Sequence, residues 1–205
     1  MTTTITTATP RCPHFGQCGG CQLQNIAYEE QLSHKRNKLA HILQTASIDA
    51  PTITTHASEP YEYRNRIRLR LERIDGTFRL GYNRADSNDF LPITTCSIAA
   101  PILWQSAEAL LSIATINRET EAWLNATAQV ELFTNDTTDR VQLTLLCNGP
   151  RKTPQPATFL RFAEALQQAA PYITSIAAVT YDPRTALTGR TLASHGPAGL
   201  TYMVN

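Results

Sequence analysis

Four cysteines constrain this chain more than any other feature of its sequence. Cys12, Cys18 and Cys21 lie in the segment CPHFGQCGGC, and Cys96 follows much later in LPITTCSI. Three thiolates from a tight loop and a fourth from a distant segment are a typical ligand set for an iron–sulfur cluster. Glycines within the same loop let the backbone approach a bulky inorganic group closely. The pattern therefore predicts a cluster held by these four side chains.

Two other uses of the cysteines stay open at this point. A zinc ion could take the same thiolates, with His14 as an optional ligand, although zinc ribbons usually repeat a short pair and only Cys18 and Cys21 form one here. Disulfides agree less well with the sequence, because the number of cysteines is five and the chain starts without a signal peptide. We expect Cys147, the fifth, to be a buried and unreactive thiol at the end of a strand.

The length of 205 residues allows one large domain or two small ones with a real hydrophobic core. The first ten residues, MTTTITTATP, have neither the charge nor the apolar run of a signal or transit peptide, and we interpret them as a disordered lead-in. No stretch is long and apolar enough for a membrane span. We therefore expect a cytoplasmic protein with no membrane partner. The net charge of +1 argues neither for nor against nucleic acid.

A helix is predicted from residue 26 to about residue 45, because apolar side chains recur there at steps of three and four. Lys35, Arg36 and Lys38 give its middle a basic patch, which is either an RNA contact or an ordinary solvated face. Residues 46–60, with two prolines, follow as a linker.

An arginine-rich strand comes next. Apolar residues alternate with arginines there, and period two sends all the guanidinium groups to one face; the arginines are Arg64, Arg66, Arg68 and Arg70. Asp75-Gly76 predicts a hairpin turn, after which residues 78–82 alternate in the same way. Like charges in a row repel one another unless anions lie opposite. A phosphate backbone would supply those anions and suits the planar guanidinium, while acidic side chains on a neighbouring strand are the alternative.

The remaining sequence reads as an α+β core. The periodicities predict helices from Pro101 to Leu111, over residues 119–125 and from Phe159 to just before Pro171, with strands at residues 129–133, 141–145 and 173–181. Glycines at 189, 196 and 199 indicate loops towards the end.

Three stretches together resemble the RNA (uracil-5-)-methyltransferase family, whose members make 5-methyluridine in ribosomal or transfer RNA. They are CPHFGQCGGCQLQNIAYEEQLSHKRNKL, YRNRIRLR and LGYNRADSNDFLPITTCSI. The resemblance implies that Cys12, Cys18, Cys21 and Cys96 hold a 4Fe-4S cluster. It also implies S-adenosylmethionine as methyl donor and RNA as partner, ribosomal rather than transfer RNA. The arginine strand would then belong to a central RNA-binding domain.

The resemblance covers only the N-terminal and central portion of the family. The chain ends at GLTYMVN, about where the catalytic domain should begin, and no glycine cluster suited to S-adenosylmethionine occurs before it. We therefore expect no catalytic residues here, a cofactor site only in the missing C-terminal domain, and an inactive monomer. A standalone iron–sulfur module that binds RNA without catalysis is the alternative, and a zinc-bound structural adaptor is a weaker one.

The fold expected from these features is α+β. A disordered lead-in over residues 1–10 would precede an N-terminal cysteine-rich iron–sulfur loop and helix over 11–58. A mixed or antiparallel sheet domain with helices would follow over 59–205, with Cys96 closing the cluster. A Rossmann-like catalytic domain would be absent.

Overall fold

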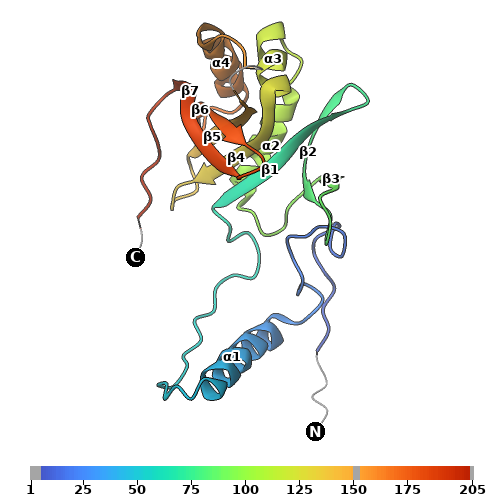
Figure 1. The fold of residues 1–205 in the computed structure, drawn as a ribbon, viewed down its shortest axis with the longest axis vertical. Coiled ribbons are helices and arrows are strands. Elements are labelled where there is room, and N and C mark those ends of the chain that lie inside the picture. The colour runs from blue at the N-terminus through green and yellow to red at the C-terminus, as the bar shows by residue number, and fades with distance from the viewer. Residues whose placement is uncertain (1–5, 150–152, 204–205) are drawn as a thin grey trace.

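The computed structural model describes residues 6–149 and 153–203. Within them lie seven strands, four α-helices and a short 3-10 helix (Figure 1). In chain order the elements are α1 (Tyr28–Thr45), β1 (Arg66–Ile74), β2 (Thr77–Asn83), β3 (Phe90–Pro92), α2 (Pro101–Ser112), α3 (Arg118–Ala126), β4 (Thr127–Thr134), β5 (Val141–Asn148), η2 (Pro156–Thr158), α4 (Phe159–Ala169), β6 (Ile173–Asp182) and β7 (Leu187–His195).

All seven strands join one mixed sheet in the order β3-β2-β1-β4-β5-β6-β7. Every neighbouring pair is antiparallel except β5 and β6, which run parallel. A parallel pair needs a crossover connection, and α4 supplies it between these two strands. Figure 1 shows helices α2, α3 and α4 gathered around the sheet at one end of the molecule.

The hairpin of β1 and β2 forms where the sequence predicts it. Its two-residue turn consists of Asp75 and Gly76, which have φ angles of 49° and 78°, and Ile74 pairs with Thr77 across it. Two successive positive φ angles are the mark of a type I′ turn, whose twist matches that of the flanking strands. From Arg66 to Leu71 the apolar residues of β1 are buried and the arginines are not, so the predicted alternation is confirmed.

The hydrophobic core lies between the sheet and the three packed helices. Trp123 of α3 meets Phe159 of α4 edge to face, with ring centroids 4.9 Å apart. The indole Nε1 donates to the Thr158 hydroxyl at 3.1 Å, which satisfies the one polar atom of that buried ring. Phe162, one turn further along α4, is also fully buried. These aromatic side chains belong to the buried core that packs α3 and α4 together.

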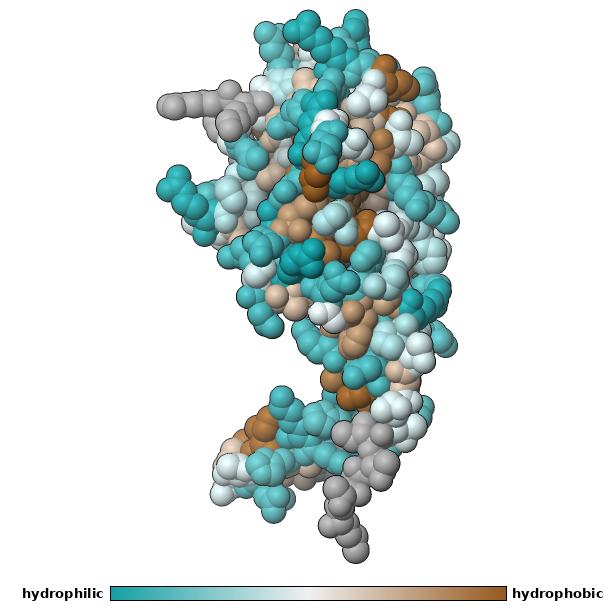
Figure 2. All heavy atoms as spheres, turned by 90° about the vertical axis from the view of Figure 1, so that its right-hand side faces the viewer, coloured by the Kyte–Doolittle hydropathy of each residue, from teal (hydrophilic) through white to brown (hydrophobic). Residues whose placement is uncertain are grey.

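Helix α1 stands apart from this core and contains no buried residue. Figure 2 shows the lobe that contains it projecting from the body, with apolar side chains on its surface; Leu39, Ile42 and Ile48 are exposed. Residues 48–59 return from it without helix or strand, as predicted for a linker. In the described part of the chain, no helix has the length and apolar character that crossing a membrane requires.

The predicted fold class is wrong. We expected an iron–sulfur loop with a helix as one unit and a sheet domain as another, whereas the described residues form one seven-stranded mixed sheet with four α-helices. The cysteine-rich segment is not an independent loop, because Cys18 forms a β-bridge with Arg84 just after β2. The described residues contain no group of three His, Cys, Asp or Glu side chains arranged around a metal ion. A long-range pairing such as the Cys18–Arg84 bridge leaves no periodic signal in the sequence.

Two further segments differ in the structure from what the sequence predicts. The end of the chain, expected to be loops, contains strand β7, which pairs with β6 through an irregular register. The lead-in over residues 1–10 falls partly outside the described residues; in its described part the Ala8 N–H donates to the Asn25 carbonyl at 2.9 Å, and Thr7 bridges Ile26. The predicted domain boundaries stay a prediction.

Candidate functional site

The four predicted cluster ligands line one cavity. Cys12, Cys18 and Cys21 approach it from the N-terminal loop, and Cys96 approaches from the segment that follows β3. The cavity has a volume of about 400 Å³. All four thiols are free and half-buried. The structure therefore brings together side chains separated by up to 84 positions in the sequence.

Backbone hydrogen bonds fasten the cysteine loop to the end of β2. The Gly19 N–H donates to the Asn83 carbonyl at 3.2 Å, and the Ala85 N–H donates to the Gln17 carbonyl at 2.8 Å. A Cβ atom on Gly19 would lie 3.5 Å from the Arg84 carbonyl oxygen, so the loop and the strand end are already in van der Waals contact. Cys18, between the two hydrogen-bonded positions, is held in place by the sheet.

His14 ties the same loop to the segment that carries Cys96. Its Nε2 accepts a hydrogen bond from the Thr94 N–H at 3.0 Å and lies 3.2 Å from the Thr94 hydroxyl. A ring nitrogen that accepts from an amide is unprotonated, which leaves the proton of a neutral ring on Nδ1. This nitrogen is therefore engaged in joining two chain segments, and the optional zinc-ligand role considered for His14 would require breaking that contact.

Burial shapes the chemistry of the thiols. The pKa of Cys18 is raised, chiefly because the thiol is partly desolvated and also because negative charge on the other three cysteines would repel its thiolate. A hydrogen bond from the Gly20 N–H to the Cys18 sulfur, at 3.4 Å, opposes this rise. The Tyr82 hydroxyl lies 4.0 Å from the Cys96 sulfur. Burial raises the pKa of the Tyr82 phenol, and the charge of Cys96 adds to the rise.

The donor set has the number and kind of ligands that a cubane cluster takes. The four thiols line one cavity, and such a cluster takes one thiolate at each of four separate irons. Gly19 and Gly20 line the cavity without side chains, which leaves room beside the sulfurs.

Three of the four predicted arginines line this cavity as well. Arg64, Arg68 and Arg70 border it, while Arg66 does not. Arg68 pairs with Glu131 at 2.7 Å, directly across the β1–β4 ladder. An acidic residue on the neighbouring strand was the alternative to phosphate, and it is present at this position.

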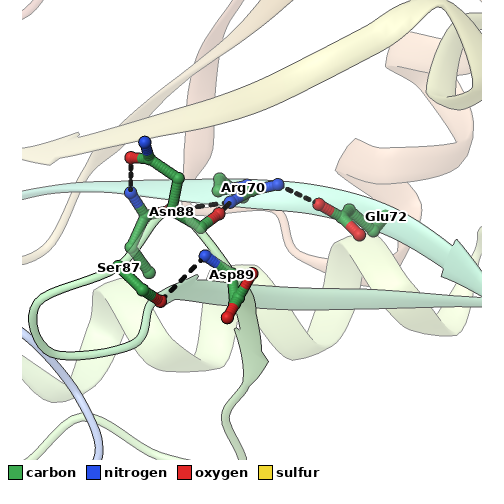
Figure 3. A network of polar contacts seen from close by, with 6 residues as sticks. Arg70, Glu72, Ser87, Asn88 and Asp89 are labelled. Carbon is green, nitrogen blue, oxygen red and sulfur yellow. Dashed lines mark hydrogen bonds and ion pairs between the residues drawn. The ribbon is translucent and has the colours of Figure 1, made fainter.

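Arg66 and Arg70 have different surroundings. The Arg66 guanidinium lies over the Phe133 ring, 5.0 Å from its centroid, and has no acidic partner among the described residues. Arg70 is the centre of the polar network in Figure 3: it contacts Glu72 and donates to the Asn83 side chain at 2.8 Å and to the Asn88 carbonyl at 2.7 Å. Arg70 therefore holds the loop between β2 and β3 against β1.

The basic residues of α1 form a separate surface. Lys35, Arg36 and Lys38 are exposed and do not line the cysteine cavity. The structure thus divides the predicted RNA-contacting residues into a helix set and a strand set. Cys147 is fully buried in β5, and burial raises its pKa to about 11, in agreement with the expected unreactive thiol.

Sequence reasoning missed Tyr82 and Asn83 as parts of the site. Both line the cavity. The sequence pattern of the hairpin, however, indicates only that they continue its second strand. Their place beside the cysteines depends on the docking of the loop onto the end of β2, for which the sequence carries no local signal.

Comparison with known proteins gives relatives and a similar solved structure. The chain is 36% identical over 97 residues to a 23S rRNA (uracil(1939)-C(5))-methyltransferase of Chromohalobacter salexigens, a match that covers 47% of this chain and 20% of the relative. It is 42% identical over 106 residues to the protein of the same name from Edwardsiella ictaluri, covering 50% of this chain and 23% of the relative. The resemblance to the RNA (uracil-5-)-methyltransferase family is confirmed.

The solved structure of Pyrococcus abyssi tRNA (uracil-54, C5)-methyltransferase with S-adenosyl-L-homocysteine is similar in fold, with a TM-score of 0.61 at 18% identity. The likeness covers 91% of this chain and 43% of that one. The described sheet therefore has the fold of part of that solved structure, which overturns the predicted fold class. No family model matches the chain. Matched segments make up only about a fifth to a quarter of the curated relatives.

Proposed function

We propose that this chain is the cysteine-bearing and RNA-binding part of an S-adenosylmethionine-dependent RNA (uracil-C5)-methyltransferase acting on ribosomal RNA. The observation that carries the proposal is the meeting of all four cysteines at one cavity in a chain whose relatives are named 23S rRNA (uracil-C5)-methyltransferases. The structural neighbour is named for transfer RNA, but its identity to this chain is much lower. The cytoplasmic location and the monomeric state stay predictions.

Within this proposal the cavity holds a 4Fe-4S cluster through Cys12, Cys18, Cys21 and Cys96. A cluster bound there would join the N-terminal loop to the sheet, since only Cys96 comes from the second segment. Hydrogen bonds already join the two segments without a cluster. The loop is hydrogen-bonded to the end of β2, and His14 is hydrogen-bonded to Thr94, two residues before Cys96. Iron binding would take the thiols as thiolates and release their protons.

The test is anaerobic purification of the chain after iron-replete expression, followed by iron, sulfide and zinc analysis. We expect about four irons and four sulfides per chain. Cys96→Ser should lower the iron content and, because it unties the junction, make the N-terminal loop more accessible to proteases. Stoichiometric zinc without sulfide would refute the cluster and favour the structural adaptor.

RNA would bind through phosphate contacts from Lys35, Arg36 and Lys38 on α1 and from the arginine face of β1. On the strand, Arg66 is the best candidate for an RNA phosphate contact, because it lacks an acidic partner among the described residues.

Each phosphate contact steepens the dependence of log affinity on log salt by about 0.7–0.9. The Arg66→Gln variant should therefore lower that slope by about one unit or less, measured by fluorescence anisotropy with a ribosomal RNA fragment. Arg161, which pairs with Glu119 on the helical side, offers a matched control as Arg161→Gln. Equal slopes for both variants would remove Arg66 from the RNA surface.

The proposed enzyme differs in catalysis and cofactor binding from the alternative, a standalone iron–sulfur module that binds RNA. In the family, methyl transfer to carbon 5 of uracil follows covalent attack by a cysteine, and we propose no residue of this chain for that role. We expect the isolated chain neither to bind S-adenosylmethionine in calorimetry nor to methylate RNA. Translating the gene beyond Asn205 would separate an enzyme, whose reading frame continues into a methyltransferase domain, from a module that ends without one.

A further inference from the structure

The wall of the cysteine cavity has an unusual charge. Among the described residues that line it are three arginines, Arg64, Arg68 and Arg70, and neither an aspartate nor a glutamate. Two of the arginines are partly neutralised just outside the wall, since Arg68 pairs with Glu131 and Arg70 contacts Glu72. The cavity as a whole is therefore suited to an anionic occupant.

Arg64 is the one of the three that has no counter-charge. Its guanidinium has no hydrogen-bond or ion-pair partner in the described part of the chain, whereas its backbone is firmly fixed. The Arg64 N–H donates to the Ile98 carbonyl at 2.8 Å, and the Ala100 N–H donates to the Arg64 carbonyl at 2.9 Å. These bonds attach Arg64 to the segment that begins at Cys96, whose carbonyl accepts from the Ala99 N–H at 3.1 Å.

Arg64 and Cys96 line the same cavity. The Arg64 cation therefore lies at the wall of the space that the four thiols surround.

We propose that Arg64 is the cation that stabilises negative charge in the cysteine cavity, rather than a contact to RNA phosphate. This inference rests on the proposed cluster, which adds net negative charge to the cavity in the form of four thiolates. Net charge and solvent exposure are among the properties that set the potential of such a cluster. Arg64 favours the more negative, reduced state, so removing its charge makes reduction less favourable.

The size of the effect follows from Coulomb's law in a partly solvated cavity. One unit charge acting there changes the one-electron reduction equilibrium by a factor of roughly three to ten. At 59 mV per tenfold change, Arg64→Gln should lower the reduction potential by roughly 28–59 mV. Arg64→Lys keeps the charge and should restore most of that loss.

The experiment is a mediator titration of anaerobically prepared full chain, followed by electron paramagnetic resonance, with circular dichroism to verify folding. The matched control is Arg66→Gln, at the first arginine of β1, which does not line the cavity and should leave the potential unchanged. Loss of the cluster in Arg64→Gln but not in Arg64→Lys would also support the charge role.

The outcomes separate this inference from the proposed function. A wild-type chain without iron and sulfide refutes both. A wild-type cluster whose potential is the same in Arg64→Gln and Arg66→Gln refutes the role of Arg64 and leaves the cluster standing. Equal loss of the cluster in Arg64→Gln and Arg64→Lys would also refute it, because a requirement for the arginine shape is structural rather than electrostatic.

Discussion

Gly81 offers a sharp test of how the sheet positions Cys96. In β2 it pairs with Pro92 of β3, and the strands approach so closely that a Cβ on Gly81 would lie 2.0 Å from the Leu91 carbonyl oxygen. The same Cβ would lie 2.8 Å from the Phe90 ring. A backbone carbonyl cannot turn away as a flexible side chain can. In Gly81→Ala, β3 must therefore shift by about 1 Å or more to restore normal contact.

The loss of stability in Gly81→Ala follows from typical values for overpacked sites. Forcing one methyl group into a packed site typically costs about 1–3 kcal/mol. For a chain of this length, each 1 kcal/mol lowers the melting temperature by about 2–4 °C. We therefore expect Gly81→Ala to melt about 2–12 °C below the wild type. Because Cys96 follows the end of β3 by four residues, the displaced strand should also move that thiol and lower the iron content.

Gly199→Ala is the matched control. Its Cβ would lie 3.7 Å from the nearest atom, the Gln142 Oε1, which is an ordinary contact, and its φ angle is not in the left-handed region. The free energy of unfolding of this variant should stay within about 0.5 kcal/mol of the wild-type value. Thermal melts by circular dichroism compare the three proteins. If Gly81→Ala melts with the wild type and retains its iron, the close approach of β2 and β3 does not position Cys96.

Two further predictions concern the core. Leu69 is fully buried on β1, so Leu69→Ala should lower the free energy of unfolding by about 2–5 kcal/mol through lost packing, as measured by urea denaturation; a value near zero would contradict the burial of that strand face. Cys147 has a pKa raised by burial to about 11, so its thiol stays protonated below that pH and should not react with iodoacetamide at pH 8 in the folded chain. It should react once urea exposes it, and Cys147→Ser should leave the iron content unchanged.

The sequence predicted local features of the fold well, because each rests on contacts between neighbours. Alternation along β1 requires only that one face of a strand is buried, and the Asp75-Gly76 turn requires only two residues that tolerate positive φ. The predicted helices begin and end within a few residues of α1, α2 and α4, where three- and four-residue periodicity and Pro101 mark the boundaries. None of these signals involves distant parts of the chain.

The wrong fold class has the opposite origin. The parallel pairing of β5 with β6 depends on the α4 crossover, and the joining of all strands into one sheet depends on the β1–β4 ladder across more than 50 residues. Strand β7 was missed because exposed polar residues dominate it. Its Gly189, taken as a loop signal, lies in the strand, where a Cβ would meet the Thr180 hydroxyl at 2.4 Å. Glycine there serves close strand packing rather than a turn.

The arginine strand shows both what a local sequence pattern predicts and what it cannot predict. Period two correctly puts Arg66, Arg68 and Arg70 on one face, but it cannot tell what lies opposite that face. A row of guanidinium groups is equally consistent with phosphate, with acidic partners and with an anionic cavity, because each supplies negative charge. The choice is made residue by residue through long-range contacts: Glu131 lies beside Arg68, the Phe133 ring beside Arg66, and the cysteine cavity beside Arg64. One sequence motif therefore has several different electrostatic environments, and substituting the arginines together would combine loss of the Arg68–Glu131 pair with loss of the RNA contact proposed for Arg66 and of the charge role proposed for Arg64.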